Sequence, residues 1–241
     1  MAAARRVQLH RLIGTRLEAG YAEQAGEIAA ELAVHFERGR DTQRAVQYLG
    51  QAGENAARKS AHREVIAHLT KGLDLLKTLP DTPERARQEL PLQLALGGPL
   101  IATTGYTTLE TRAAFGRARE LCQQVGETPQ LFTALSGLQS FYLVRAEYQT
   151  ARELAEQGLG LAQHSQNPTL LMAARLGMGT ILVCSESSFL PSNIFSKVLL
   201  CPILSNTIPL PHKRLRIRES RASPLLPLPC GIWVIRTRRW K

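Results

Sequence analysis

The sequence predicts an all-α protein made of antiparallel helix pairs over residues 1–184, followed by an irregular tail over residues 185–241. Two observations lead to this fold class. Apolar residues recur every three or four positions through the first part of the chain, which is the spacing of amphipathic helices. The helices begin about 20 residues apart, so that a helix pair repeats about every 40 residues, as in solenoid proteins.

Nine helices are predicted in this part of the chain. Between residues 22 and 38, Ile28, Leu32 and Phe36 recur every four positions and form one apolar stripe, whereas the glutamates fall elsewhere. Ala45 and Leu49 begin a similar stripe in the next segment. The predicted helices cover residues 4–19, 22–38, 42–59, 61–78, 83–98, 108–125, 129–144, 148–163 and 168–183.

Glycines and capping side chains predict where these helices end and begin. Gly39 suits the left-handed position after a helix end, and Gly126 is expected to end the helix that precedes it. Asp41 or Thr42 can cap the helix from residue 42.

Later helix starts combine a capping residue with an acidic residue or a proline. Thr107 and Glu110 have the spacing of a capping box. Proline fits the first helical position because the N–H that it lacks would have no partner there. Three starts of this kind are Thr82-Pro83, Thr128-Pro129 and Asn167-Pro168.

The residues that pack the helices recur at fixed intervals. Small residues let two helices approach closely, and an aromatic side chain of the first helix fills the gap beside the second. Three copies of the pattern start at Leu32-Ala33, Ala52-Gly53 and Leu138-Gln139. The predicted packing residues are Leu32, Ala33, Phe36, Ala45, Leu49, Ala52, Val65, Leu69, Leu138, Tyr142 and Ala151.

This pattern resembles the tetratricopeptide repeat, in which small and aromatic residues at such intervals join two antiparallel helices. Here the tryptophan and the late proline of that family are absent, and the period is longer. Stretches such as AGEIAAELAVHFERGRDTQRAVQYLGQAG and RARELCQQVGETPQLFTAL also look like the repeat region at the C-terminus of large bacterial signalling proteins, which join a nucleotide cyclase or transcription regulator to an ATPase and then to repeats. The resemblance implies a sensor or partner-binding arm.

Composition argues against several other classes of protein. No GxxxxGK[ST] stretch is present, so the phosphate-binding loop of an ATPase is missing. The four cysteines form no CxxC pair, so we expect no metal site and a reduced, cytoplasmic protein. There is no apolar run of about 20 residues and no secretory signal pattern at the start of the chain, so we expect no membrane span.

The formal charge of +10 belongs mainly to the tail. Residues 1–184 hold 20 Lys and Arg against 18 Asp and Glu, whereas residues 185–241 hold 10 against 2. A helix-turn-helix over residues 30–53 would place Gln43, Arg44 and Gln47 on a recognition helix. The near-neutral charge of the helical part and the recurrence of the same spacing at residues 138–158 argue against DNA binding there.

Candidate functional residues lie on the early helices. Exposed polar side chains there are expected to line a groove for a protein or peptide partner, and the candidates are Arg44, Gln47, Arg58, Arg63 and Lys71. Glu31 and His35 lie one turn apart, but two ligands make only half a zinc site. We therefore expect no catalytic residue, no cofactor and no metal.

The tail differs in character from the rest of the chain. It holds seven of the 13 prolines and loses the helical periodicity. We favour an out-of-frame or interrupted end that replaces further repeats. A basic tail that contacts nucleic acid or an acidic membrane, and a small separate extension, are the alternatives.

The sequence thus favours a non-enzymatic scaffold that binds a protein or peptide in a bacterial signal-transduction system. The first alternative is an inactive fragment detached from a cyclase or ATPase regulator. The second is a nucleic-acid binder that acts through its basic tail.

Overall fold

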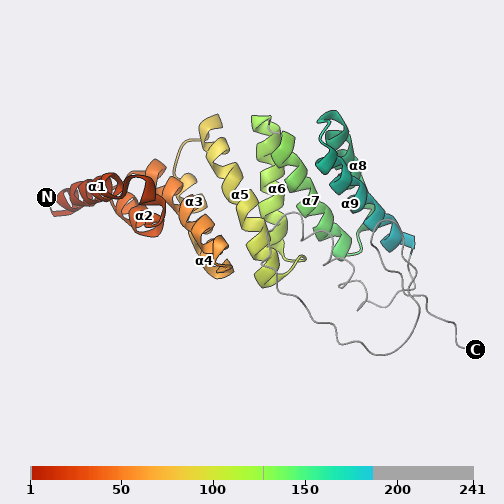
Figure 1. Ribbon diagram of the computed structural model, residues 1–241, viewed down its shortest axis with the longest axis horizontal. Helices are drawn as coiled ribbons and strands as arrows, with labels where there is room; N and C mark the ends of the chain where they lie inside the picture. The colour runs from red at the N-terminus through yellow and green to blue at the C-terminus, as the bar shows by residue number, and fades with distance from the viewer. Residues whose placement is uncertain (1, 127, 187–241) are drawn as a thin grey trace, which may run out of the picture. The chain divides into compact units, whose positions relative to one another are not determined.

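The computed structural model describes residues 2–126 and 128–186, and this part of the chain is all-helical (Figure 1). It contains nine α-helices, one 3-10 helix and no strand within those residues. The helices are α1 (Ala2–Tyr21), η1 (Ala22–Gly26), α2 (Ala29–Arg38), α3 (Thr42–Arg58), α4 (His62–Leu76), α5 (Pro83–Thr104), α6 (Leu109–Val125), α7 (Thr128–Val144), α8 (Tyr148–His164) and α9 (Pro168–Glu186). The all-α fold class predicted for residues 1–184 is confirmed at this level.

The helices pack in chain order. From α1 to α9, each helix contacts the one before it and the one after it, and α5 also reaches α7. Buried residues form successive clusters along the helices: one is built around Leu32 and Phe36, a second around Leu69 and Leu92, and a third around Leu90 and Leu121. Within the described residues, each helix between α1 and α9 therefore packs against both of its neighbours in the chain.

One interhelical turn occurs three times with the same geometry. The amide N–H groups of Asp41, Ala61 and Glu147 each donate to the carbonyl oxygen five residues earlier. The residue before each of these donors, Arg40, Ser60 or Ala146, has a positive φ of 55 to 59°. A left-handed residue followed by this 6→1 hydrogen bond is the Schellman ending of a helix. Two of the repeat positions named from sequence, Phe36 and Tyr142, supply acceptor carbonyls in these turns.

Several predicted helix ends are confirmed. Asp41 and Thr82 cap α3 and α5 by accepting from the N–H groups of Arg44 and Arg85. The side chain of Asn167 accepts from the N–H groups of Thr169 and Leu170 at the start of α9. Gly126 adopts the left-handed conformation after α6, with φ of 80°.

The predicted capping box at Thr107 and Glu110 is wrong by one residue. The cap of α6 is Thr108, whose hydroxyl accepts from the N–H of Thr111. The hydroxyl of the buried Thr111 lies 2.9 Å from that of Thr108 and donates to the carbonyl of Gly105. Because Thr111 must lie inside to make these bonds, the register of the first turn is fixed by burial rather than by the Thr-x-x-Glu spacing.

Gly39 does not have the left-handed conformation expected of it. Its φ is −77°, and Arg40 takes the positive φ instead. A Cβ atom at residue 39 would lie 3.1 Å from the backbone nitrogen of Arg11 and 3.0 Å from the carbonyl oxygen of His35. Glycine is therefore required for the close approach of α1, whose Arg11 donates to the Gly39 carbonyl.

Two predicted helices differ from the structure by more than three residues. The helix predicted over residues 22–38 is divided into η1 and α2, because Ile28 leaves the helical conformation with φ of −99° and ψ of 21°. The helix predicted to end at residue 98 continues to Thr104 through Pro91 and Pro99. Burial of Leu96 and Leu100 on both sides of the Gly97-Gly98-Pro99 sequence stabilises the longer helix against these breakers.

Gly97 and Gly137 make room for one aromatic ring. A Cβ at residue 97 would lie 2.2 Å from the Cζ atom of Phe115, and a Cβ at residue 137 would lie 2.5 Å from the same ring. The ring of Phe115, on α6, is thus held between α5 and α7. Gly97 of α5 and Gly137 of α7 therefore both lie against this ring, and α5 and α7 also contact each other.

Gly97→Ala and Gly98→Ala are expected to have opposite effects on stability. A Cβ at residue 98 meets nothing within 4 Å, so Gly98→Ala should stabilise the helix by up to about 1 kcal/mol. Gly97→Ala gains the same helix propensity but overpacks against Phe115, and the net loss should be about 1–2 kcal/mol. Urea denaturation of the two variants checks this. Equal midpoints for the two variants would contradict the packing described here.

One helix of the described part, over Pro168–Ser185 in α9, is long and apolar enough to cross a membrane by length and composition, and 22% of that stretch is buried. Ala174 and Ile181 face the rest of the helices, whereas Met172, Leu176 and Val183 are exposed. The expectation of no membrane span stays a prediction. The predicted boundary after residue 184 also stays a prediction, and the expectations for the tail concern residues beyond Glu186, outside the described part.

Candidate functional site: a groove between α3, α4 and α5

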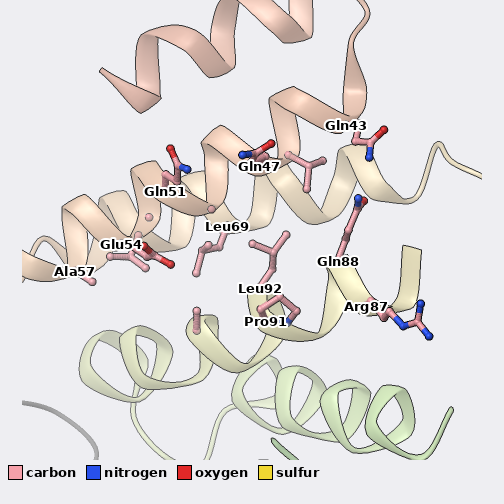
Figure 2. Close-up of a pocket in the computed structure, with 15 residues that line it drawn as sticks. Gln43, Gln47, Gln51, Glu54, Ala57, Leu69, Arg87, Gln88, Pro91 and Leu92 are labelled. Atoms are coloured by element: carbon pink, nitrogen blue, oxygen red, sulfur yellow. The ribbon is translucent and has the colours of Figure 1, made fainter. Parts of the chain in front are cut away.

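A groove of about 480 Å³ runs between α3 and α5, with α4 at its base (Figure 2). Three helices that follow one another in the chain thus build the whole site. The lining residues are Gln43, Val46, Gln47, Gly50, Gln51, Gly53, Glu54 and Ala57 of α3, Val65 and Leu69 of α4, and Arg87, Gln88, Pro91, Leu92 and Ala95 of α5.

The floor of the groove is apolar and tightly packed. Val46, Leu69 and Leu92 are buried there and belong to one hydrophobic cluster. Glycines on α3 and α4 let these side chains lie close to the helix backbones: a Cβ at residue 53 would lie 2.8 Å from Leu69, and one at residue 72 would lie 3.3 Å from Leu92. The floor is therefore a fixed surface of leucine and valine side chains.

The rim of the groove carries polar side chains that have no partner within the described residues. Gln43 and Gln47 on α3 and Gln88 on α5 make no side-chain hydrogen bond there. Figure 2 shows Gln88 extending from α5 toward α3. A carboxamide can donate and accept at once, which matches the main chain of a peptide. The arrangement can therefore bind a peptide backbone over an apolar floor.

Gln51 differs from the other lining glutamines. Its Oε1 atom is buried and has no hydrogen-bond partner within the described residues. This oxygen lies 3.8 Å from the position of a Cβ on Gly26, in η1. In Figure 2 the Gln51 side chain extends away from Leu69 and Leu92. Its carboxamide therefore points away from the apolar floor of the groove.

Two prolines within α5 leave backbone carbonyls without their helical donors. Proline has no N–H, so the carbonyls four residues before Pro91 and Pro99 lose their intrahelical hydrogen bonds. These carbonyls belong to Arg87 and Ala95, and both residues line the groove and are exposed. The α5 wall thus has two carbonyls that lack the usual N–H donor four residues later.

Of the five residues predicted to line a partner groove, the structure places only Gln47 in this one. Arg44 instead pairs with Glu18 of α1 at 2.9 Å, and Lys71 pairs with Glu37 of α2. Arg58 is exposed and donates to Asn55, and Arg63 is exposed without an ion pair in the described part. Arg44 therefore forms an ion pair between α3 and α1, and Lys71 forms one between α4 and α2.

The predicted packing residues lie between the helices. Tyr142 is half-buried, and the other ten are buried, namely Leu32, Ala33, Phe36, Ala45, Leu49, Ala52, Val65, Leu69, Leu138 and Ala151. Two of them also have a role at the site, because Val65 and Leu69 form part of the groove lining.

A polar cluster holds α1 against α3 beside this core. The hydroxyl of Tyr48 donates to Glu18 at 2.6 Å, and Arg44 donates to the second oxygen of the same carboxylate. Burial first, and then the hydrogen bond to Glu18, raise the pKa of Tyr48 to about 12. The phenol therefore stays protonated and serves as a hydrogen-bond donor at neutral pH.

The two metal-ligand candidates, Glu31 and His35, do not belong to a metal site in the described part. No group of three or more His, Cys, Asp or Glu residues there could hold a metal ion. Glu31 is exposed, and the Nδ1 atom of His35 lies 3.2 Å from Nδ1 of His10 rather than near a carboxylate. Burial, followed by the charge of His35, lowers the pKa of His10. Cys184 is buried, and burial raises the pKa of its thiol.

A bidentate ion pair joins α5, one of the groove helices, to α6. Arg117 binds Glu89 through two nitrogens, at 2.7 and 3.1 Å, and the Glu89 side chain is only 12% exposed. Burial alone would raise the pKa of Glu89, but the hydrogen bonds and charge of Arg117, with Gln93 and Arg85, outweigh it. The pKa of Glu89 is therefore below its ordinary value of 4.5.

Glu89→Gln is expected to destabilise the protein by about 1–2 kcal/mol at pH 7. Because folding lowers the pKa of Glu89, its contribution is complete above pH 4.5 and is lost as the pH falls through the folded-state pKa. Urea denaturation at pH 7 and pH 3 should show a difference between wild type and variant that shrinks at the lower pH. Glu156→Gln is the control, since its pair with Arg152 is exposed, and should change stability by less than about 0.5 kcal/mol.

Sequence reasoning missed most of the groove. Gln43 and Gln47 are spaced four residues apart on α3, and this spacing could have indicated one polar stripe. Arg87, Gln88 and Pro91 could not be placed opposite that stripe, because nothing in the sequence gives the position of α5 across α4 from α3. No protein-family model matches the sequence, and no curated protein matches it.

Proposed function

We propose that this chain is a non-catalytic scaffold that holds a segment of a partner protein in the groove between α3 and α5. The observation that supports this most is the combination of an apolar floor with glutamine side chains that have no partner within the described residues. Pockets that bind ligands are mostly apolar with a few well-placed polar groups. A glutamine rim suits a peptide main chain, whose groups alternate between donor and acceptor.

We further propose that the helices form a tetratricopeptide-like solenoid. Support comes from the interhelical turn that recurs at residues 36–41, 56–61 and 142–147, and from the burial of the recurring packing residues. Solenoids of helix pairs bind partners along extended surfaces. The resemblance to the repeat region of bacterial signalling proteins supports a role as a sensor or partner-binding arm in signal transduction, in the cytoplasm.

Selection from a library of random twelve-residue peptides on the immobilised full chain tests the proposed function. Ala95 is exposed on the groove wall, so Ala95→Trp places an indole in the groove without disturbing the core. Ala113→Trp is the control, since Ala113 is exposed on α6 and does not line the groove.

Selected peptides should bind at least tenfold more weakly to Ala95→Trp and with unchanged affinity to Ala113→Trp. Circular dichroism should show the same helix content for both variants. If no peptide is selected above background, or if Ala95→Trp binds as wild type does, the groove is not a binding site. The alternative of an inactive fragment would then be favoured.

A further inference from the structure

We propose that the groove selects an extended peptide with an acidic residue at one end and a basic residue about five positions away, the acid lying at Arg87 and the base at Glu54. This inference rests on the proposed function and adds the chemistry of the partner. The charges at the two ends of the groove, the distance between them and the backbone carbonyls along the α5 wall support it.

The two charges lie at opposite ends of the groove. Figure 2 places Arg87 at the end where Gln43 and Gln88 lie, and Glu54 at the end where Ala57 lies. Neither side chain makes an ion pair within the described residues. By contrast, Arg85, two positions before Arg87, is paired with Asp81. Arg87 and Glu54 are therefore available to charges of opposite sign on a partner.

The length of the groove sets the spacing of the partner's charges. Gln43 and Glu54 are eleven residues apart on α3, which corresponds to about 16 Å along the helix axis. An extended chain covers about 3.3 Å per residue, so the two charged residues of the peptide lie about five positions apart. Side chains between them face Leu69, Leu92 and Pro91, so apolar residues are favoured in the middle.

The available acceptors favour an extended peptide over a helical one. The carbonyls of Arg87 and Ala95 lack intrahelical donors because of Pro91 and Pro99. Eight residues of α5 place them about 12 Å apart along the wall. A helical ligand uses nearly all of its own N–H groups internally, whereas an extended one presents them at regular intervals. Two main-chain N–H groups of an extended peptide can therefore donate to these carbonyls.

Four pools of capped, fluorescein-labelled peptides test the inference on the full chain. Each peptide has two charged residues at each end and four randomised positions between them, so that the two inner charges are five positions apart. The first pool begins with two aspartates and ends with two lysines, and the second has the reverse order. The third pool has aspartates at both ends and the fourth has lysines. Fluorescence polarisation measures the binding of each pool.

One of the two bipolar pools should bind about tenfold more tightly than each of the other three. An exposed ion pair contributes roughly two- to fivefold, and two pairs act together. The difference should shrink in 0.5 M NaCl because salt screens exposed charges. Equal binding of the two bipolar pools, or of a uniform pool and the better bipolar pool, would overturn the inference.

The variant Arg87→Glu/Glu54→Lys exchanges the two charges and keeps the net charge. It should invert the order of the two bipolar pools. Arg63→Glu/Glu64→Lys is the matched control, because it exchanges two exposed charges of α4 outside the groove and should leave the order unchanged. If peptides bind in a manner that Ala95→Trp abolishes but that the charge exchange leaves unaffected, the proposed function stands and this inference fails.

Discussion

Phe115→Ala is expected to lower the free energy of unfolding by about 3–5 kcal/mol. The ring is 5% exposed and lies between Gly97 of α5 and Gly137 of α7. Both glycines lack a side chain that could move into the space, so the variant retains a cavity between three helices. Loss of contacts around a cavity that cannot collapse is what makes such substitutions costly.

Urea denaturation followed by circular dichroism measures this effect. Leu109→Ala is a control on the same helix, because Leu109 is 70% exposed, and it should change stability by less than about 0.5 kcal/mol. A loss below about 1 kcal/mol for Phe115→Ala would mean that α5, α6 and α7 do not enclose the ring as described. The contact between α5 and α7 would then need another explanation.

Phe36→Ala is expected to have an effect of similar size, about 3–5 kcal/mol, in the N-terminal part of the chain. Its ring is fully buried and stacks on Tyr48 with centroids 5.6 Å apart. The guanidinium of Arg44, on α3, lies 5.2 Å from the centroid of the Phe36 ring. A Cβ at Gly14 of α1 would lie 3.2 Å from the same ring. One side chain thus joins α1, α2 and α3.

Amide hydrogen exchange of Phe36→Ala locates the loss as well as measuring it. Exchange should become faster in α1, α2 and α3 before it does so in α7 and α8, because helix arrays open locally. Val34→Ala is the control, since Val34 is exposed on the same helix. Equally faster exchange in all helices would indicate that they unfold as one cooperative unit. Unchanged exchange would contradict the conclusion that Phe36 packs α1, α2 and α3 together.

The helices themselves could be predicted from the sequence because each apolar stripe and each cap is local information. Asp41, Thr82 and Asn167 have the expected capping bonds. Helix propensity gave the wrong helix end where tertiary packing outweighs it. The continuation of α5 through Gly97, Gly98 and Pro99 depends on Leu96 and Leu100, which are buried in a cluster with residues of α3 and α4 and with Ala114 of α6.

The candidate site could be predicted only in part. The sequence indicated that polar residues of the early helices would face a partner, and Gln47 does line the groove. It could not show that Arg44 and Lys71 are used in ion pairs with Glu18 and Glu37, because those acids lie on other helices. Whether a basic side chain forms an ion pair between helices or faces a partner therefore depends on the tertiary structure.

The most direct test of the account is an NMR titration of the full, ¹⁵N-labelled chain with the tightest peptide of the better bipolar pool. The side-chain amide signals of Gln43, Gln47 and Gln88 should shift together, with backbone signals of α3 and α5 near Glu54 and Arg87. Signals of α8 should stay in place. Shifts confined to α8 and α9, or no shift at the three glutamines at saturating peptide, would contradict binding in this groove.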